Sequence, residues 1–400
     1  MDIDENENKL RSLHISSLDE EEDEDDDVED ELTDEDDDEE DRVPMTLGFA
    51  EKPKYPWSLL PQYFPSKAGG MPAWLDPVNL PSEKSSLCDF CGEPLQFLLQ
   101  VYAPLPENST FHRSLFIFMC PSMACLLRDQ HDQWKKHPET PSRSVKVFRC
   151  QLPRVNPFYA SEAPAEDGTE QPLTAGAILC NWCGTWKGDK ICSSCRIARY
   201  CSGKHQTAHW RSSNASHKVL CRQLETSGKE IESAASKSLW PEYEIVNEDE
   251  FELDEIPDNN GSASALVSRS RKDEYFGKLQ TYFKGSGESR SWASFHERIS
   301  LAPDQVLRYS SSAQAKPIWP MASGRPSTVD IPKCNYCGGT RGFEFQVLPQ
   351  LLYFFHVEDG EDSLDWATIV VYTCESSCEA SVGYKEEFAW VQLASQSISH

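Results

Sequence analysis

Runs of apolar residues predict three strands in the first half of the chain. The run QFLLQVY is apolar on both faces, as in a strand buried on two sides, and alternation puts Phe97, Leu99 and Val101 on one face. The runs at 112–120 and 144–152 predict two more strands. These three segments indicate a β-rich core.

The rest of the pattern is less regular. The stretch from Met45 to Leu80 is rich in proline and aromatic residues, which favours an irregular wrapping segment over a helix or strand. Apolar positions at helical spacing predict helices over 273–284 and about 289–299. One stripe of the first helix carries three apolar side chains: Phe276, Leu279 and Phe283.

An internal repeat relates the two ends of the chain. CDFCGEPLQFLLQVYAPLP, starting at Cys88, aligns with CNYCGGTRGFEFQVLPQLL, starting at Cys334, and both contain Gln-Val in the strand. The next strands also match (LFIFMCPSMAC against TIVVYTCESSC), as do the last (VKVFRCQL against EEFAWVQL). A half of about three strands buries little core alone, so we expect the two halves to pair.

The sequence therefore predicts an α+β, mainly β fold. Duplicated β-rich half-domains form one domain, with a small Cys/His-rich module inserted between them and a disordered acidic tail in front. The predicted boundaries are 1–43 for the tail, 44–159 for the N-terminal half, 160–177 for a linker, 178–224 for the Cys/His-rich module, 225–272 for a partly irregular connector and 273–400 for the C-terminal half.

Charge is concentrated at the N-terminus. Residues 1–43 carry 24 acids and three bases, a net charge of −21 out of −28 for the chain, and 20 of the acids lie within 19–41. Such a run repels itself and buries no apolar area, which predicts disorder. The tail is either a solubilising segment or a clamp for a basic partner.

Composition also limits the compartment and the use of cysteine. No apolar run approaches the roughly 20 residues of a membrane helix, and the N-terminus lacks the pattern of a secretory signal. We therefore expect a soluble protein of the cytoplasm and nucleus that binds no membrane. Because thiols stay reduced there, the 15 cysteines indicate metal binding rather than disulfides.

Eight candidate ligands lie in four pairs between 180 and 221. Structural zinc takes four Cys or His ligands and leaves no open position, so eight ligands make two tetrahedral sites. Redox chemistry of a Cys-x-x-Cys pair is the disfavoured alternative. The candidates are Cys180, Cys183, Cys192, Cys195, Cys201, His205, His217 and Cys221.

The segment ARYCSGKHQTAHW makes this module resemble the MYND zinc finger. The resemblance implies interleaved sites: Cys180, Cys183, Cys201 and His205 bind one zinc ion, and Cys192, Cys195, His217 and Cys221 bind the second. His205 stands where most members have Cys, and the longer stretch before His217 leaves His209 as a competitor for that role.

The module is also basic. Its charge serves either solubility or the binding of RNA, an acidic partner or the tail, and the MYND resemblance implies a groove for short proline-containing peptides. Eight bases oppose Asp189 alone: Lys187, Lys190, Arg196, Arg199, Lys204, Arg211, Lys218 and Arg222.

Two further cysteine quartets accompany the repeat. Each pairs a Cys-x-x-Cys turn with a strand end, as in zinc ribbons, although buried thiols acting as small hydrophobes remain the alternative. Cys150 has no partner in the pattern and is interpreted as a core residue. The quartets are Cys88, Cys91, Cys120, Cys125 and Cys334, Cys337, Cys374, Cys378.

From residue 45 to 393 the chain resembles the programmed cell death protein 2 family. The resemblance runs through LGFAEKP, FLLQVYAPLP, FHRSLFIFMC, VFRCQLPRVNPFY, the finger, PEYEIV, LRYS, PIWP, FEFQVLPQLL, LDWATIVVYTC and YKEEFAWVQ. It implies a dedicated chaperone or adaptor that captures a newly made basic ribosomal protein, the S-two type of the small subunit, and supports ribosome biogenesis and rRNA processing. Exposed aromatic residues and a sheet edge are suited to holding an extended client segment.

Two other functions compete with this interpretation. A methyltransferase, which MYND fingers also accompany, needs a glycine-rich cofactor turn and an Asn-His pair, and the chain has no Asn followed by His. We therefore expect neither an enzyme nor a small-molecule substrate. A transcriptional or chromatin adaptor that binds protein partners through the finger remains the alternative.

Overall fold

A computed structural model describes most of the chain beyond the acidic tail. The described residues are 43–81, 84–135, 142–212, 217–219, 221, 239–250, 286–357, 360 and 362–393. The acidic segment and the helix predicted over 273–284 lie outside these residues. The chain divides into two units at Arg42, and all described residues belong to the second, Val43–His400.

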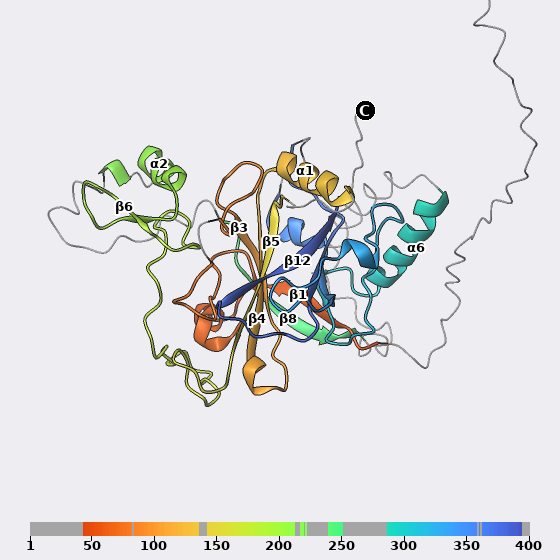
Figure 1. Cartoon of the computed structure of the whole chain (residues 1–400), viewed down its shortest axis with the longest axis horizontal. Coiled ribbons are helices and arrows are strands. Elements are labelled where there is room, and N and C mark those ends of the chain that lie inside the picture. The colour runs from red at the N-terminus through yellow and green to blue at the C-terminus, as the bar shows by residue number, and fades with distance from the viewer. Residues whose placement is uncertain are drawn as a thin grey trace, which may run out of the picture. The chain divides into compact units, whose positions relative to one another are not determined.

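Ten strands close into one barrel (Figure 1). Neighbouring strands follow the order β1-β8-β2-β3-β4-β5-β12-β11-β10-β9, and β9 pairs with β1 to complete the circle. Neighbouring strands of the barrel pair antiparallel. The strands are β1 (Thr46–Glu51), β2 (Lys67–Ala68), β3 (Gln96–Tyr102), β4 (His112–Met119), β5 (Val145–Leu152), β8 (Tyr243–Asp249), β9 (Gln305–Tyr309), β10 (Arg341–Val347), β11 (Thr368–Cys374) and β12 (Tyr384–Gln392).

The three strands predicted in the first half are confirmed as β3, β4 and β5. The stretch to Leu80 is largely irregular as expected, with short 3-10 turns at Pro56–Leu59 and Pro61–Tyr63, but strand β1 at its start was not predicted. The prediction that Phe97, Leu99 and Val101 share one face of the strand is wrong. The register of β3 shifts between Phe97 and Leu99, so Phe97 packs outside the barrel while Leu99 packs inside.

Apolar side chains from alternate positions of the strands fill the barrel. Two helices bury side chains against this interior: α1 (Met123–Trp134), above the strands in Figure 1, and α7 (Gln350–Phe354). The largest strand contributions to the interior are Leu99, Val101, Leu115, Ile117, Val147, Ile245, Leu307, Phe345, Val347, Ile369, Val371 and Val391.

Strands from before and after the inserted module are direct neighbours. β5 pairs with β12, so the arrays β3-β4-β5 and β12-β11-β10 lie side by side in reversed order. Both β3 and β10 contain a register shift, the second between Phe343 and Phe345. A buried glutamine follows each shift and holds an outer segment: Gln100 accepts from Ala73 N, and Gln346 accepts from Ile318 N, each at 2.8 Å.

Charged side chains are also buried inside the barrel. Arg113 of β4 forms a two-pronged ion pair with Glu344 of β10, with Nη2 2.7 Å from Oε2. Tyr309 and Thr373 lie beside this pair, and Thr373 donates to Glu344. A buried charge is tolerated only with such partners, so this ion pair fixes how two distant strands face each other.

One long helix lies beside the barrel strands. Helix α6 (Ser286–Ser300) confirms the helix predicted over about 289–299. Its residues Trp292, Phe295 and Ile299 are buried in a cluster with Leu348 and Met321. Among the described residues, no helix is long and apolar enough to span a bilayer.

Candidate metal centres

Four Cys-x-x-Cys turns in the structure share one backbone design. In each, the residue after the second cysteine adopts a left-handed φ and its N–H donates to the carbonyl of the first cysteine at 2.8–2.9 Å. Glycine adopts this conformation without strain, and three of the four residues are Gly. The donors are Gly92, Gly184, Arg196 and Gly338. These turns aim both sulfurs of a pair at one point.

The inserted module is built from a short hairpin and a helix. Strands β6 (Lys190–Ile191) and β7 (Arg199–Tyr200) pair antiparallel, and α2 (Gly203–Arg211) follows directly. Ser202 caps α2 by accepting a hydrogen bond from His205 N at 3.0 Å. This cap places the His205 ring one turn after Cys201, on the same side of the helix start.

The first group of four in this module is Cys180, Cys183, Cys201 and His205. The Cys183 and Cys201 sulfurs are 3.9 Å apart, and His205 Nδ1 lies 3.2 Å from the Cys201 sulfur. The four ligand atoms all lie within 4.8 Å of one another. This is the set that the interleaved pairing implies.

The second group is Cys192, Cys195, His217 and Cys221. His217 Nε2 is 3.5 Å from the Cys195 sulfur, and the Cys192 and Cys221 sulfurs are 4.0 Å apart. His209, the competitor for this role, is fully buried elsewhere, with Nδ1 3.0 Å from the Tyr200 hydroxyl. The structure therefore places His217, and not His209, in the group.

Each barrel quartet also comes together, at the end of a strand. The Cys91–Cys120 sulfur distance is 3.6 Å in the first, and the Cys337–Cys374 distance is 3.6 Å in the second. Cys125 and Cys378 complete the groups from the residues after β4 and β11, as predicted. Cys150 lies in none of them; it is fully buried, and burial raises the pKa of its thiol to about 12.

The spacing of all four groups fits a tetrahedral zinc ion. A Zn–S bond of about 2.3 Å separates two sulfurs by about 3.8 Å at the tetrahedral angle, close to the distances above and far from an S–S bond of about 2.0 Å. In the first barrel quartet, contact with the Cys120 thiol lowers the pKa of Cys88 to about 5, and the same contact raises the pKa of Cys120. The lowered pKa favours the Cys88 thiolate, which is the form that binds a metal ion.

The second barrel quartet is held by buried charges. Glu387 of β12 accepts from Cys374 N at 3.2 Å and from Arg149 Nε at 2.7 Å. Arg149 also donates to the Cys378 carbonyl at 3.2 Å, and Arg341 Nε lies 2.9 Å from the second Glu387 oxygen. Such outer partners orient metal ligands. The quartet is thereby connected to the interior of the barrel.

The inserted module packs on the outer aromatic face of β3 and β4. Trp186 is fully buried there, with its indole N–H 2.7 Å from the Leu95 carbonyl and its ring 4.4 Å from the Phe118 ring. Trp74 donates in return to the Thr185 carbonyl at 2.9 Å. The two tryptophans contact each other, with centroids 5.6 Å apart.

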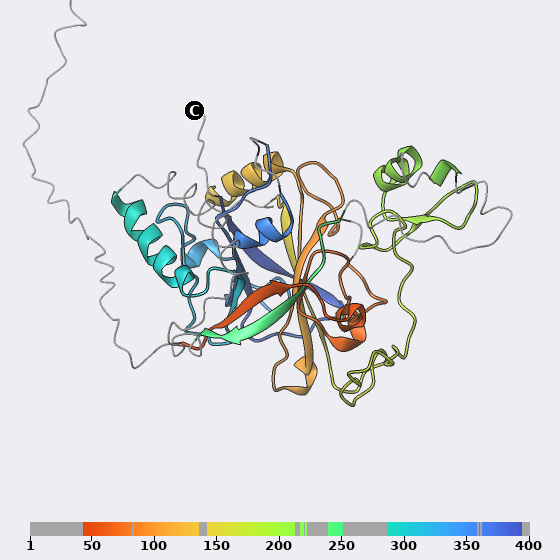
Figure 2. The ribbon, with the colours of Figure 1, turned by 180° about the vertical axis from the view of Figure 1, so that it is seen from behind.

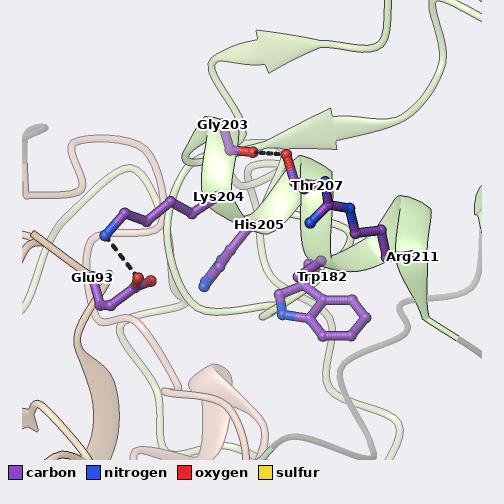
Figure 3. A pocket seen from close by; sticks show the side chains of 8 residues that line it. Glu93, Trp182, Gly203, Lys204, His205, Thr207 and Arg211 are labelled. Carbon is purple, nitrogen blue, oxygen red and sulfur yellow. Dashed lines mark hydrogen bonds and ion pairs between the residues drawn. The ribbon is translucent and has the colours of Figure 1, made fainter.

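A cleft of about 550 Å³ lies along α2, with Glu93 on its barrel side (Figure 3). Lys204 of α2 reaches across to Glu93, at 2.7 Å, while the Trp182 ring and the Arg211 side chain lie on the other side. His205, a member of the first group, also lines it. The cleft thus offers an indole surface beside Arg211 on one side, while Lys204 on the other side is already paired with Glu93.

Comparisons with known proteins agree with this architecture. Family models match three segments: the programmed cell death protein 2 N-terminal domain (44–166), the MYND finger (180–221) and the programmed cell death protein 2 C-terminal putative domain (289–393). The mouse (Mus musculus) Programmed cell death protein 2 is 40% identical over 87% of this chain and 96% of its own length. The chain belongs to the programmed cell death protein 2 family.

More distant relatives extend the family. The human (Homo sapiens) Programmed cell death protein 2-like is 28% identical over 84% of this chain and 91% of its own. A Schizosaccharomyces pombe relative named Probable 20S rRNA accumulation protein 4 is 23% identical over 83% and 93%. No solved structure matches the chain. The MYND match identifies the inserted module as a zinc-binding finger.

Sequence reasoning found the sixteen cysteines and histidines of the four groups but missed what surrounds them. Glu387 and Arg149 gave no local signal, because their partners lie elsewhere in the sequence. One clue was available: Trp186 and Trp74 are bulky aromatic residues in otherwise polar, irregular segments, which is typical of residues that anchor one element on another.

Proposed function

We propose that this protein is a dedicated chaperone or adaptor for a newly made basic ribosomal protein, the S-two type of the small subunit, and that it supports small-subunit biogenesis. Membership of the programmed cell death protein 2 family carries the proposal. The fission yeast relative's name, which refers to rRNA, supports it. The protein would act by binding, without catalysis, in the cytoplasm and nucleus.

The charge of the chain suits such a client. A free ribosomal protein is cationic and exposes the surface that later binds RNA phosphates. The 20 acids within 19–41 would attract it over the Debye length of about 8 Å in physiological salt and speed the encounter. The folded part would then hold the client, because a screened, diffuse charge alone gives little lifetime to a complex.

The metal content belongs to the same proposal. We infer two zinc ions in the finger and one in each barrel quartet, because all four groups share the same Cys-x-x-Cys turn. We also infer that the barrel arose from two copies of one half. The matched register shifts and the paired glutamines, Gln100 and Gln346, support that origin.

Purified components test the function. The full-length protein should form a stable complex with the S-two ribosomal protein and prevent its precipitation at physiological salt. A basic ribosomal protein of the large subunit serves as the charge-matched control. Equal binding of both, or of neither, would remove the assignment.

Truncation separates the two parts of the mechanism. If the tail steers the client, deleting residues 1–43 slows association and flattens its salt dependence while dissociation barely changes. If the tail also clamps, dissociation accelerates as well. Stopped-flow kinetics at two salt concentrations distinguish these outcomes, and unchanged rates would identify the tail as a solubiliser.

A second candidate is a transcriptional or chromatin adaptor that binds proline-containing peptides or acidic partners through the finger. The cleft beside Trp182 favours it, because a proline ring packs well on an indole face. Affinity purification from nuclear and cytoplasmic extracts discriminates the two candidates. Chromatin complexes lost on Trp182→Ala would support the adaptor, whereas a ribosomal protein retained by that variant supports the chaperone.

A further inference from the structure

The barrel is closed unevenly at strand β8. On one side β8 pairs with β1 through six residue pairs, from Glu51–Glu244 to Thr46–Asp249. On the other side it pairs with β2 through Tyr243 and Glu244 only, because β2 has two residues. Figure 2 shows β8 (green) beside β1 (red-orange) on the near side of the barrel. Among the strands that the structure describes, Asn247 therefore has a neighbour on the β1 side only.

Hydrogen-bond parity shows which backbone groups face the open side. Ile245 N donates toward β2, to Ser66 O at 2.9 Å, whereas Glu250 N donates toward β1, to Met45 O. Because bonding alternates along a strand, the N–H and C=O of Asn247 face the β2 side. Residue 64 would continue the pairing there, but Phe64 has a φ of 52° and the chain turns away.

Asn247 has no hydrogen bond to any residue that the structure describes. The segment around it is exposed on a strand, where burial usually alternates: Val246 is 37% exposed, and Asn247, Glu248 and Asp249 are exposed as well. An open strand edge with an exposed apolar side chain is a template for adding another strand.

The charge around this edge is negative. Glu51 and Glu244 are directly opposite each other across β1 and β8, an arrangement that costs stability in a sheet. Glu51, Glu244 and Glu248 form no ion pair with the described residues. The sequence from 242 to 258 contains nine acids and no Lys or Arg, and of these Glu242 and Glu250 form ion pairs with Lys67 and Arg308. Ser58 Oγ donates to Glu244 at 3.3 Å, but among the described residues no cation neutralises the Glu51–Glu244 pair, which indicates an external cation.

We propose that the open edge of β8 binds an extended cationic segment of the client protein, which adds to the barrel as a further strand. This inference rests on the proposed function. Backbone bonds to Asn247 give the segment its position, and Glu244 and Glu248 select Lys or Arg side chains that project on either side of Val246. A second copy of this chain, or its own acidic tail, would bring more negative charge to the same edge and be repelled.

Asn247→Pro in the full-length chain tests the strand addition. Proline removes the N–H that faces the open side and leaves the bonds of Val246 and Glu248 to β1 intact. Asn247→Ala is the matched control, since it loses the amide side chain but keeps the N–H. We expect at least about tenfold weaker client binding for Asn247→Pro, unchanged binding for Asn247→Ala, and the same melting temperature for both.

Charge reversal provides a test that does not depend on backbone geometry. Glu248→Lys is compared with Glu379→Lys, an exposed carboxylate remote in sequence that makes the same change in net charge. We expect Glu248→Lys to weaken client binding about tenfold and Glu379→Lys to leave it within twofold. Hydrogen exchange should show the Asn247 amide protected when the client is bound.

The outcomes separate the edge from the function. If the wild-type chain fails to bind the S-two protein, the proposed function fails, and this inference falls with it. If the wild type binds the client and Asn247→Pro and Glu248→Lys bind it as tightly as the wild type does, the proposed function stands. The proposal that the client adds to the β8 edge is then overturned. A wild-type dimer that Asn247→Pro dissociates would also overturn it, by identifying a second copy as the occupant.

Discussion

The arrays β3-β4-β5 and β10-β11-β12 share strand order, a register shift, a buried glutamine and a cysteine quartet, yet they differ on both faces. Outside, the aromatic face of the first array is covered by the finger through Trp186, whereas that of the second is covered by its own chain, with Trp319 and Ile331. The same three-strand array thus has its outer face covered by the zinc finger in one case and by its own chain in the other.

The inner faces differ at the register shift. Leu98 occupies the shifted position in β3 and packs in the apolar interior, whereas Glu344 occupies it in β10 and pairs with Arg113. The buried carboxylate at the shift therefore belongs to the second array, and the arginine that pairs with it belongs to the first. Because Glu387 and Arg149 extend this charged region to Cys374 and Cys378, metal at the second quartet should matter more to the barrel than metal in the finger does.

The largest effect is expected from the second quartet. Cys374→Ser removes one ligand of four and loosens the backbone that Glu387 holds, so the barrel should lose about 5 kcal/mol of unfolding free energy. Cys192→Ser should unfold the finger and leave the barrel transition in place. Calorimetry of both variants, with Cys150→Ala as a buried cysteine outside every group, measures this. Equal barrel transitions in the Cys374 and Cys192 variants would contradict the coupling.

The buried ion pair gives a smaller effect. Glu344→Gln keeps the shape of the side chain but leaves the Arg113 charge, 2% exposed, without its counter-ion, which should cost about 3–5 kcal/mol. The double variant Arg113→Leu with Glu344→Leu, which removes both charges of the pair from the barrel interior, should recover most of that loss. Urea unfolding at pH 7 is the measurement. An unchanged free energy of unfolding in Glu344→Gln would show that the ion pair is not needed for stability.

The smallest effect concerns pH and belongs to the first array. His112 of β4 is stacked on Phe64 at 4.1 Å, and burial lowers its pKa from 6.5 to about 4. The unfolded chain thus binds a proton between pH 6.5 and 4 that the folded chain excludes. Stability is full above pH 6.5 and falls as the pH drops, by about 2 kcal/mol at pH 5.

The control for this prediction is His112→Gln, which carries no titrating group. Between pH 7 and 5 the unfolding free energy of His112→Gln should fall less than that of the wild type, because the His112 contribution is gone. Glu344→Gln should keep the His112 contribution. Urea unfolding of the two variants and the wild type at three pH values makes the comparison. Parallel slopes in all three proteins would assign the acid sensitivity to other groups.

Local patterns predicted the elements that carry their signal in the sequence. The apolar runs gave β3, β4 and β5, the helical spacing gave α6, and the cysteine spacing gave four candidate groups. Strands β1, β8 and β9 were not predicted, because they are short or polar and their pairing partners lie far away in the sequence. β1 pairs with strands about 200 and 260 residues later.

The remaining misses have a common physical cause. Phe97 turned outward because a bulge inserts one residue, which no alternation pattern reveals. Arg113 and Glu344 are separated by 231 positions in the sequence. Without a visible partner, an Arg or Glu in a strand is predicted to lie on the surface. The one-sided pairing of β8, which begins where a left-handed Phe64 ends the pairing with β2, also has no local signal in the sequence. Each depends on tertiary contacts.

Metal content tests the central claim that the barrel quartets are sites of the same kind as those of the finger. Native mass spectrometry of the full-length, folded chain, with zinc counted independently by elemental analysis, gives the number of ions per molecule. The account predicts four zinc ions, three in Cys374→Ser, and four in Cys150→Ala. Two ions in the folded wild type, with Cys374→Ser unchanged, would contradict it.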